Sequence, residues 1–444
     1  MKNRDLTQGN ISTHLLYLAL PLMLGNVLQQ MYNTIAALVV NRYASGLEYA
    51  ATGVAGSVMN LFLFIVVGGC TGISVLFSPQ YGARDLPTFR RQHFLSLTCG
   101  LGATAVLSLG AILLLPWLLR VIQTPDALFT YTKVYLTIVL GSLPAAVLYN
   151  LYNALLRSVG STNAALGVLT LSVGLNLALS LLFVGKLSMG IAGAAWATAI
   201  AQMFSAAACF AYLRTVHREL IFTREDCRLD RELLKRTAHF SFVTAMHQSG
   251  LYLGKLLVQG AVNSMGTDLI SAYTTTTRIE GFANSAGDGC SAATSVLVAQ
   301  NMGAKEEGRV KETYRKSLGI CAAMGLACTA VLFAFAPQAV GWFLGESSGA
   351  AFENAVEYLR IVALFYILCY TGNAFVGYLD GIGKVSLPLI GACSHISMRA
   401  ALSWLWIGQM GLGAVAWATG IGWVWCNLFW WVCCLVIARK KAAF

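Results

Sequence analysis

The chain of 444 residues is 57% hydrophobic and 11% charged, with a mean hydropathy of +0.66. A soluble domain carries roughly 25% charged residues, so this composition excludes a water-soluble protein and predicts a polytopic membrane protein. The net charge of +11 would suggest a nucleic-acid partner in a soluble protein, but in a membrane protein basic residues set the orientation instead.

Stretches without a charged residue mark the expected membrane spans, since about 20 apolar residues cross a bilayer. A charged segment at 217–236 separates six such stretches from a second half with less pure runs, of which 237–267 is broken only by Lys255. The sequence therefore predicts an all-α polytopic membrane protein with twelve transmembrane helices in two six-helix bundles. The expected spans are 6–41, 49–83, 92–119, 134–156, 158–185 and 187–213, then 237–267, 269–300, 316–343, 355–380, 386–407 and 413–438.

The distribution of basic residues between the connecting segments predicts the orientation. With a cytoplasmic N-terminus, 22 of the 30 Lys and Arg residues fall on the cytoplasmic side and four on the outside. The remaining four, Lys255, Arg278, Arg360 and Arg399, lie within spans. We therefore expect a multi-pass protein of the bacterial cytoplasmic membrane with both termini in the cytoplasm, and basic loops that contact anionic lipids.

The two halves repeat each other. Gly82-Ala83-Arg84-Asp85 returns as Gly303-Ala304-Lys305-Glu306, and Ala195-Trp196-Ala197-Thr198 returns as Ala416-Trp417-Ala418-Thr419, each 221 residues later. Tyr135-Leu136 and Gly160 match Tyr358-Leu359 and Gly383 at 223. An even number of spans per repeat predicts two parallel lobes related by a pseudo-twofold axis, with the site at their interface. We expect lobes at 1–216 and 239–444, joined by a cytoplasmic linker at 217–238 that forms a surface helix.

Two helices of the second half carry polar stripes. Thr244, Gln248, Tyr252, Lys255, Gln259 and Asn263 follow one another at steps of three or four, as do Thr277, Glu280, Asn284, Asp288, Ser291 and Ser295. Such steps place each set on one helical face, and polar faces are too costly to meet lipid. The stripes therefore predict a polar wall that faces either the interior of the second lobe or a central cleft.

The ionisable residues of this wall are the candidates for ion coupling. Helix register predicts a contact between Lys255 and Glu280, either a coupling element or only a structural clamp. Asp288 has no cation beside it, so we expect a buried proton carrier or Na⁺ ligand, with Asn284 or Ser291 supplying further oxygens; structural hydrogen bonding is the alternative. Asp380 is a further candidate, unless it is simply solvated at the end of its span.

Neutral polar residues are candidates for contact with a substrate. They either hydrogen-bond to a small molecule or hold helices together. In the first half they are Gln30, Tyr32, Asn33, Asn150 and Asn153, and in the second half Gln248, Tyr252 and Gln259.

Several motifs resemble the multidrug and toxic compound extrusion (MATE) family, in its DinF-like or NorM-like bacterial branch. They run through both halves: Asp5–Asn10, Leu20-Pro21, Gln29–Thr34, Gln80–Ala83, Asn263–Gly266, Thr277–Glu280 and Gln300–Ala304. The resemblance implies two six-helix lobes around a central cleft and export of amphipathic, often cationic, compounds driven by a Na⁺ or H⁺ gradient. DinF-like members carry an acidic residue in the first span where this chain has Ala36, and the seventh-span Glu of NorM-like members has no counterpart near Leu251.

We therefore expect a secondary active efflux transporter that works by alternating access, acts as a monomer on small-molecule substrates and binds no nucleic acid. The sequence contains no phosphate-binding loop, Ser-His-Asp pattern or Cys/His cluster with metal spacing, so we expect neither an enzyme nor a cofactor besides the coupling ion, Na⁺ or H⁺, with Na⁺ possible at Asp288. Two alternatives stay open, a lipid-linked saccharide flippase of the same superfamily and a non-transporting membrane scaffold or sensor.

Overall fold

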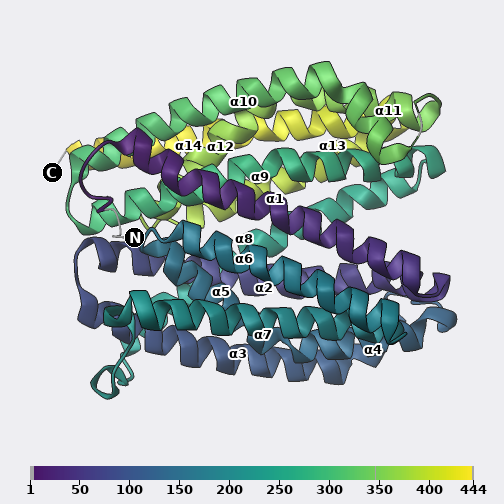
Figure 1. Ribbon diagram of the computed structural model, residues 1–444. Helices are drawn as coiled ribbons and strands as arrows, with labels where there is room; N and C mark the ends of the chain where they lie inside the picture. Colours follow the sequence, from purple (N-terminus) through teal and green to yellow (C-terminus); the bar gives the residue numbers. More distant parts are fainter. Residues whose placement is uncertain (1–4, 346, 443–444) are drawn as a thin grey trace. The chain divides into compact units, whose positions relative to one another are not determined.

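A computed structural model describes residues 5–345 and 347–442, apart from the side chains of 32–38 and 441–442. All regular structure in this part of the chain is helical (Figure 1). The first half contains α1 Ile11–Tyr43, α2 Gly46–Gly82, α3 Leu86–Val121, α4 Asp126–Gly141, α5 Leu143–Ser158, α6 Thr162–Ser180, the π-helical η1 Leu181–Lys186 and α7 Gly190–Val216. The second half contains α8 Arg231–Asn263, α9 Thr267–Gly303, α10 Glu307–Leu344, α11 Ala350–Ala363, α12 Tyr366–Gly381, α13 Ser386–Met410 and α14 Leu412–Ala442.

Contacts divide the chain into two compact units. The first unit is Val27–Ala245, and the second consists of Asp5–Asn26 together with the chain from Met246 onward. Both boundaries fall inside long helices, α1 and α8, so the start of each of these helices is assigned to the unit built from the other half of the sequence. The lobes expected at 1–216 and 239–444 follow the sequence repeat and differ from these units at both helices.

Most of the helices are long and apolar enough to cross a membrane. Within the described residues, seven helices meet this test on their own: α1, α2, α3, α6 with η1, α7, α10 and α14. The bent pairs α4–α5 and α11–α12 meet it as two further spans. α8, α9 and α13 are equally long but more polar, and at 1.5 Å per residue the shortest of them, with 25 residues, still extends about 37 Å. α8 and α9 are more polar because they carry the two polar stripes, and α13 contains His395 and Arg399.

Two of the expected spans, 134–156 and 355–380, are bent pairs of helices. α4 and α5 meet at 45° around Ser142, and α11 and α12 meet at 53° around Leu364. Pro144 lies in the first turn of α5, where its missing N–H removes a bond to the preceding helix. The second break has no proline, yet it falls at the equivalent place in the repeat.

The repeat extends to the packing of the helices. In the first unit α2 packs against α3, α4 and α5, and in the second unit α9 packs against α10, α11 and α12. Likewise α4, α5 and α6 pack on α7, while α11, α12 and α13 pack on α14. Even the strained turns recur, since Arg84 and Lys305, 221 residues apart, have φ of 57° and 62°. A positive φ is uncommon outside glycine, so its recurrence marks one turn used twice.

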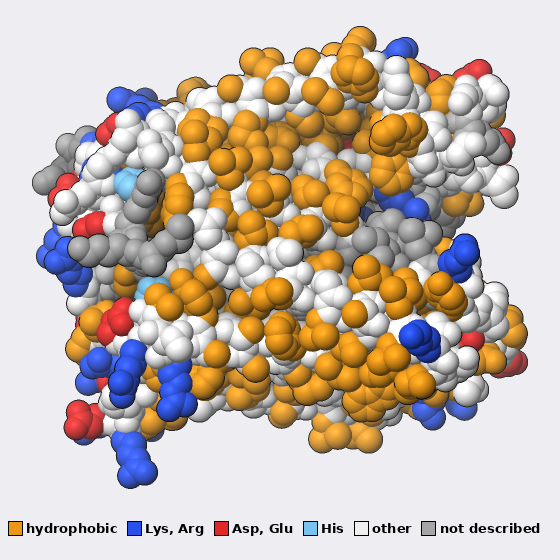
Figure 2. Space-filling model, in the orientation of Figure 1, with side chains coloured by type: hydrophobic (Ala, Val, Ile, Leu, Met, Phe, Trp, Pro, Cys, Tyr) orange, Lys and Arg blue, Asp and Glu red, His pale blue; other side chains and the backbone are white. Residues whose placement is uncertain are grey.

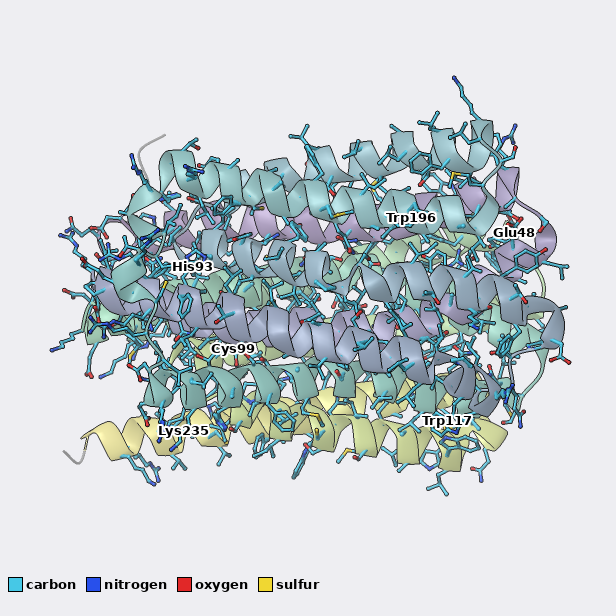
Figure 3. The ribbon with its side chains drawn as sticks, turned by 90° about the horizontal axis from the view of Figure 1, so that it is seen from below. Glu48, His93, Cys99, Trp117, Trp196 and Lys235 are labelled. Atoms are coloured by element: carbon cyan, nitrogen blue, oxygen red, sulfur yellow. The ribbon has the colours of Figure 1, made fainter. Side chains whose placement is uncertain are left out.

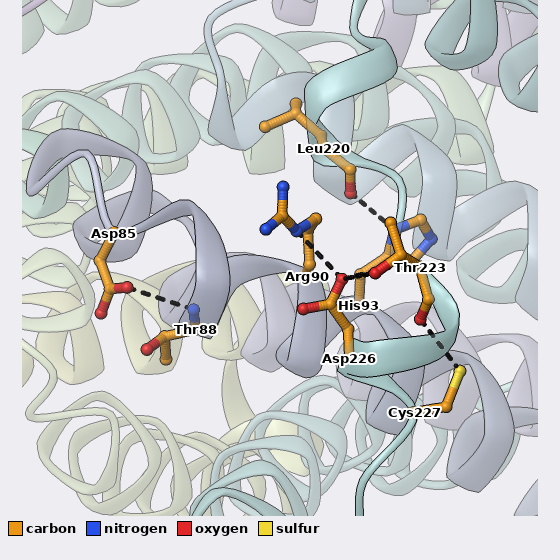
Figure 4. Close-up of polar contacts among 8 residues, drawn as sticks. All are labelled: Asp85, Thr88, Arg90, His93, Leu220, Thr223, Asp226 and Cys227. Carbon is orange, nitrogen blue, oxygen red and sulfur yellow. Dashed lines mark hydrogen bonds and ion pairs between the residues drawn. The ribbon is translucent and has the colours of Figure 1, made fainter.

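The linker between the halves is not the surface helix that the sequence predicts. It forms two single 3₁₀ turns, Arg218–Leu220 and Arg224–Asp226, that pack on α3 (Figure 4). His93 of α3 donates to the Leu220 carbonyl over 3.1 Å, and Arg90 pairs with Asp226 at 3.0 Å. Short irregular turns can follow the surface of α3 and bury Leu220 against it. A straight, solvated helix could not do so as closely.

Asp226 organises the second turn of the linker. It accepts from the backbone and the hydroxyl of Thr223, both at 2.9 Å. Burial alone would raise the pKa of Asp226, but these bonds and the charges of Arg90 and Arg91 outweigh it and lower the pKa below its usual value. The carboxylate is therefore charged at neutral pH. It stabilises the turn through Thr223 and holds the linker against α3 through Arg90.

Charged and apolar side chains are segregated along the helices. Figure 2 shows hydrophobic side chains over the middle of the helices and Lys and Arg gathered toward their ends. In the first unit, His93 and Lys235 lie toward one end and Glu48 and Trp117 toward the other (Figure 3). This segregation is what a bilayer requires of a spanning protein.

Candidate functional site

Glu280 lies near the centre of α9 and is held by aromatic neighbours. Its side chain is 8% exposed, and the Tyr358 hydroxyl of α11 donates to Oε2 over 3.2 Å. Tyr358 is fully buried, with its ring nearly perpendicular to that of Tyr273, 6.3 Å between centroids. The fixed hydroxyl and the closed surroundings hold the carboxylate in one place.

Two basic side chains act on this carboxylate. Arg399 of α13 and Lys255 of α8 both lie within electrostatic range of Glu280, and Arg399 also interacts with Tyr358. The sequence predicts Lys255 as the partner but does not predict Arg399. The available signal was the presence of a cation inside a span, because such a residue needs a counter-charge at membrane depth.

Asp288 lies two turns further along α9, about 12 Å from Glu280 at 1.5 Å per residue. It is exposed within the second unit, which corrects the expectation of a buried carboxylate. The cause is the pair of flanking glycines: a Cβ on Gly287 would lie against Asn373 of α12, and one on Gly289 against Met23 of α1. Since the residues on either side face packed helices, Asp288 turns toward the remaining open side, where Lys255 is within electrostatic range.

The neighbours of Asp288 supply further oxygen atoms. Asn284, one turn away, accepts a hydrogen bond from the Cys369 thiol over 3.6 Å. Ser285 accepts one from Asn26 of α1 at its carbonyl, over 3.1 Å. Within the described residues no three His, Cys, Asp or Glu side chains form a metal-binding group, so a cation at Asp288 would rely on amide, hydroxyl and carbonyl oxygens.

Asp380 is separate from this cluster. It lies at the end of α12, half-buried, and its Oδ1 has no hydrogen-bond partner among the described residues. The adjacent Gly381 packs against Val298 of α9, ten residues or about 15 Å beyond Asp288. The structure therefore does not bring Asp380 together with Glu280 and Asp288.

Several of the substrate candidates bond within their own helix. Asn150 donates to the Ala146 carbonyl over 2.8 Å, Asn153 donates to the Tyr149 hydroxyl over 3.0 Å, and Gln259 donates to Asn263 over 2.7 Å. Gln30, Gln248 and Tyr252 are half-buried. Tyr32 and Asn33 lie outside the described side chains, as does Ala36. The substrate assignments therefore stay predictions.

The profile of the MatE family matches residues 21–182 and 244–422, once in each half of the repeat. The chain belongs to the MATE family. It is 25% identical over 424 residues to "Probable multidrug resistance protein YpnP" of Bacillus subtilis (strain 168), with 93% of each chain covered. It is 21% identical over 417 residues to "Multidrug export protein MepA" of Staphylococcus aureus (strain NCTC 8325 / PS 47), covering 91% of this chain and 89% of the relative.

Solved structures show the same fold. An outward-facing multidrug resistance MATE family transporter of the MOP superfamily superposes with a TM-score of 0.91 at 22% identity, over 99% of both chains. A MATE in the bent conformation also superposes with a TM-score of 0.91, over 100% of this chain and 99% of that one. The family and the twelve-helix all-α architecture predicted from the sequence are thereby confirmed, and the chain is a multi-pass membrane transporter.

Proposed function

We propose that this MATE protein exports amphipathic, cationic small molecules by antiport against Na⁺ or H⁺, with alternating access. The names of its relatives in Bacillus and Staphylococcus support multidrug export. The observation that carries the coupling proposal is the pair of carboxylates on α9, one enclosed and one open, with Lys255 acting on both.

The two carboxylates have different roles in this proposal. Glu280 is held in position by the Tyr358 hydroxyl and lies within electrostatic range of Arg399. Asp288 is accessible, so a cation can reach and leave it. A cation bound to Asp288 weakens the attraction between Lys255 and that carboxylate. Lys255 then interacts mainly with Glu280. Occupancy can then favour one conformation, because a ligand shifts an equilibrium through its differential affinity for the two states.

The decisive experiment is transport in proteoliposomes. The purified protein is reconstituted with an imposed Na⁺ or H⁺ gradient, and movement of a cationic dye is followed by fluorescence. We expect Asp288→Asn to abolish gradient-driven transport while dye binding changes little. Asp268→Asn, in the exposed first turn of the same helix, is the matched control and should transport normally. Normal coupling in Asp288→Asn would refute the ion-site assignment.

The proposed orientation places both termini and the linker in the cytoplasm of a bacterial cell. Cys227 in the linker is exposed and supplies a direct test. A membrane-impermeant maleimide should label Cys227 in inverted vesicles but not in intact cells, with Cys227→Ser as the control. Labelling in intact cells would reverse the orientation.

A further inference from the structure

A pocket of about 250 Å³ opens on the second unit between the first turns of α9 and the last turn of α10. One wall is polar, and the other is formed by Phe343 and Leu344 of α10. The polar wall consists of Ser271, Thr274, Thr275 and Arg278.

The polar wall is suited to an anion. Ser271, Thr274 and Arg278 are spaced by three and four residues, so they share one face of α9, and all three are exposed. No ion pair or hydrogen bond of the Arg278 guanidinium is found within the described residues, and no carboxylate lines the pocket. A guanidinium next to hydroxyl donors matches the oxygens of a phosphate, to which Arg binds in a bidentate manner.

The pocket lies at the depth of the lipid headgroups. α9 has 37 residues and is about 55 Å long, so a helix centred on a hydrocarbon core of about 30 Å extends roughly 12 Å beyond each side. Its first eight residues then lie among the headgroups, with Arg278 just inside the boundary. Trp342, next to the pocket on α10, is 91% exposed, as is typical of an aromatic residue at the membrane interface.

The equivalent place in the first unit lacks this chemistry. With the offset of 221 that relates α2 to α9, the counterparts of the polar wall are Ala50, Gly53, Val54 and Ser57. Three of the four are apolar and none is charged. The shared helix packing therefore requires neither a cation nor a row of hydroxyl groups at this point. The polar wall of the second unit must have a reason other than packing.

We propose that this pocket binds the phosphate of an anionic phospholipid, with Arg278 as the anion ligand and an acyl chain along Phe343. Charge complementarity selects the phosphate, and the combination of an apolar wall and headgroup depth selects a lipid over a free ion. The proposal is independent of the coupling ion and of the transported substrate.

The test is native mass spectrometry of the full-length protein titrated with phosphatidylglycerol. The wild-type chain should retain one more bound phosphatidylglycerol than Arg278→Gln, or bind the tightest one at least tenfold more strongly. Arg278→Lys should recover part of the loss and show that the position tolerates change. Arg360→Gln removes a cation elsewhere on the same unit, one that lies 5.8 Å from the Phe333 ring, and should bind like the wild type.

Two further arms decide between lipid and free phosphate. Phosphatidylcholine should not replace phosphatidylglycerol, and Phe343→Ala should weaken phosphatidylglycerol binding severalfold. Equal phosphatidylglycerol binding by Arg278→Gln and Arg360→Gln would overturn the proposal. So would inorganic phosphate that displaces the lipid at equal concentration, since the site would then be an ion site without a role for the acyl chain.

Discussion

The same tyrosine has different partners in the two units. Tyr358 donates to the carboxylate of Glu280 in the second unit, while its counterpart Tyr135 donates to the sulfur of Met59 in the first, over 3.8 Å. Met59 precedes Glu280 by 221 residues, the offset of the helices that carry them. Both units therefore place a tyrosine hydroxyl at an equivalent point. Its hydrogen-bond partner is a carboxylate in the second unit and a neutral sulfur in the first.

The difference extends to the surrounding positions. With the offset of 223, Asn176 of the first unit corresponds to Arg399 of the second, and Asn176 donates to the hydroxyl of Thr198 over 3.3 Å. Asp288 corresponds to Val67, which is also exposed. The first unit is thus neutral at each of these positions. The comparison indicates that the repeat supplies the architecture and that, at the positions compared, only the second unit carries charges.

The largest loss of stability is expected when Arg399 of the second unit is replaced by asparagine, the residue at the equivalent position of the first unit. Arg399→Asn removes the larger of two favourable electrostatic interactions of the buried Glu280, and interaction energies within such a charged network reach about 3 kcal/mol. The double variant Arg399→Asn with Glu280→Met should recover much of this loss. Thermal unfolding in detergent measures both. Additive losses in the double variant would show that the two residues do not interact.

A second double-mutant cycle, with Lys255 and Glu280, compares how strongly the two cations interact with Glu280. Since Lys255 is exposed, Lys255→Met should cost less than Arg399→Asn and show a smaller coupling to Glu280→Gln. A coupling larger than that of Arg399 would restore Lys255 as the main partner of Glu280.

A close helix approach that both units share should respond equally in both. A Cβ on Gly68 would lie 2.7 Å from the Thr244 carbonyl oxygen, and one on Gly289 would lie 2.8 Å from the Met23 nitrogen. Because backbone cannot give way, Gly68→Ala and Gly289→Ala should each destabilise by about 1–3 kcal/mol. Gly102→Ala and Gly319→Ala, which meet open space, are the controls. An effect in one unit only would contradict the shared packing.

A helix start that differs between the units should respond unequally. Glu48 accepts from the backbone of Ile191 over 2.9 Å and from Ser45 over 3.0 Å, whereas its counterpart Leu269 packs against the hydrophobic core of the second unit. Hydrogen bonds to a charged group contribute about 1.5 kcal/mol. Glu48→Ala should therefore lower the unfolding temperature more than Leu269→Ala does. The reverse order would show that apolar packing dominates at both helix starts.

The smallest effect concerns the linker, which only the first unit binds. Because the folded pKa of Asp226 lies below its unfolded value of 3.8, its contribution is present above that value and is lost as the pH falls through the folded pKa. Pepsin cleavage near the buried Leu220 should therefore begin only below the usual carboxyl range. Asp226→Asn should be cleaved at higher pH, and cleavage of both proteins at the same pH would contradict the role of Asp226.

The fold could be predicted almost completely, and the site only in part. Stretches with few or no charged residues located the twelve spans, because membrane insertion is governed by local composition along the chain. The breaks at Ser142 and Leu364 could not be predicted, since the stretches remain apolar across them. The polar stripe placed Glu280 and Asp288 on one helix, but register between neighbouring helices could not rank Arg399 above Lys255.

Composition, spacing and repetition by themselves determined a membrane protein of two similar halves and the helix that bears the ionisable groups, while the resemblance of its motifs indicated the family. Only the tertiary structure decided that Glu280 is enclosed, that Asp288 is open and that the linker packs on α3. The physical reason is that insertion and periodicity depend on neighbours along the chain, whereas the exposure of a side chain depends on helices distant in sequence, such as α1 at Gly289 and α12 at Gly287.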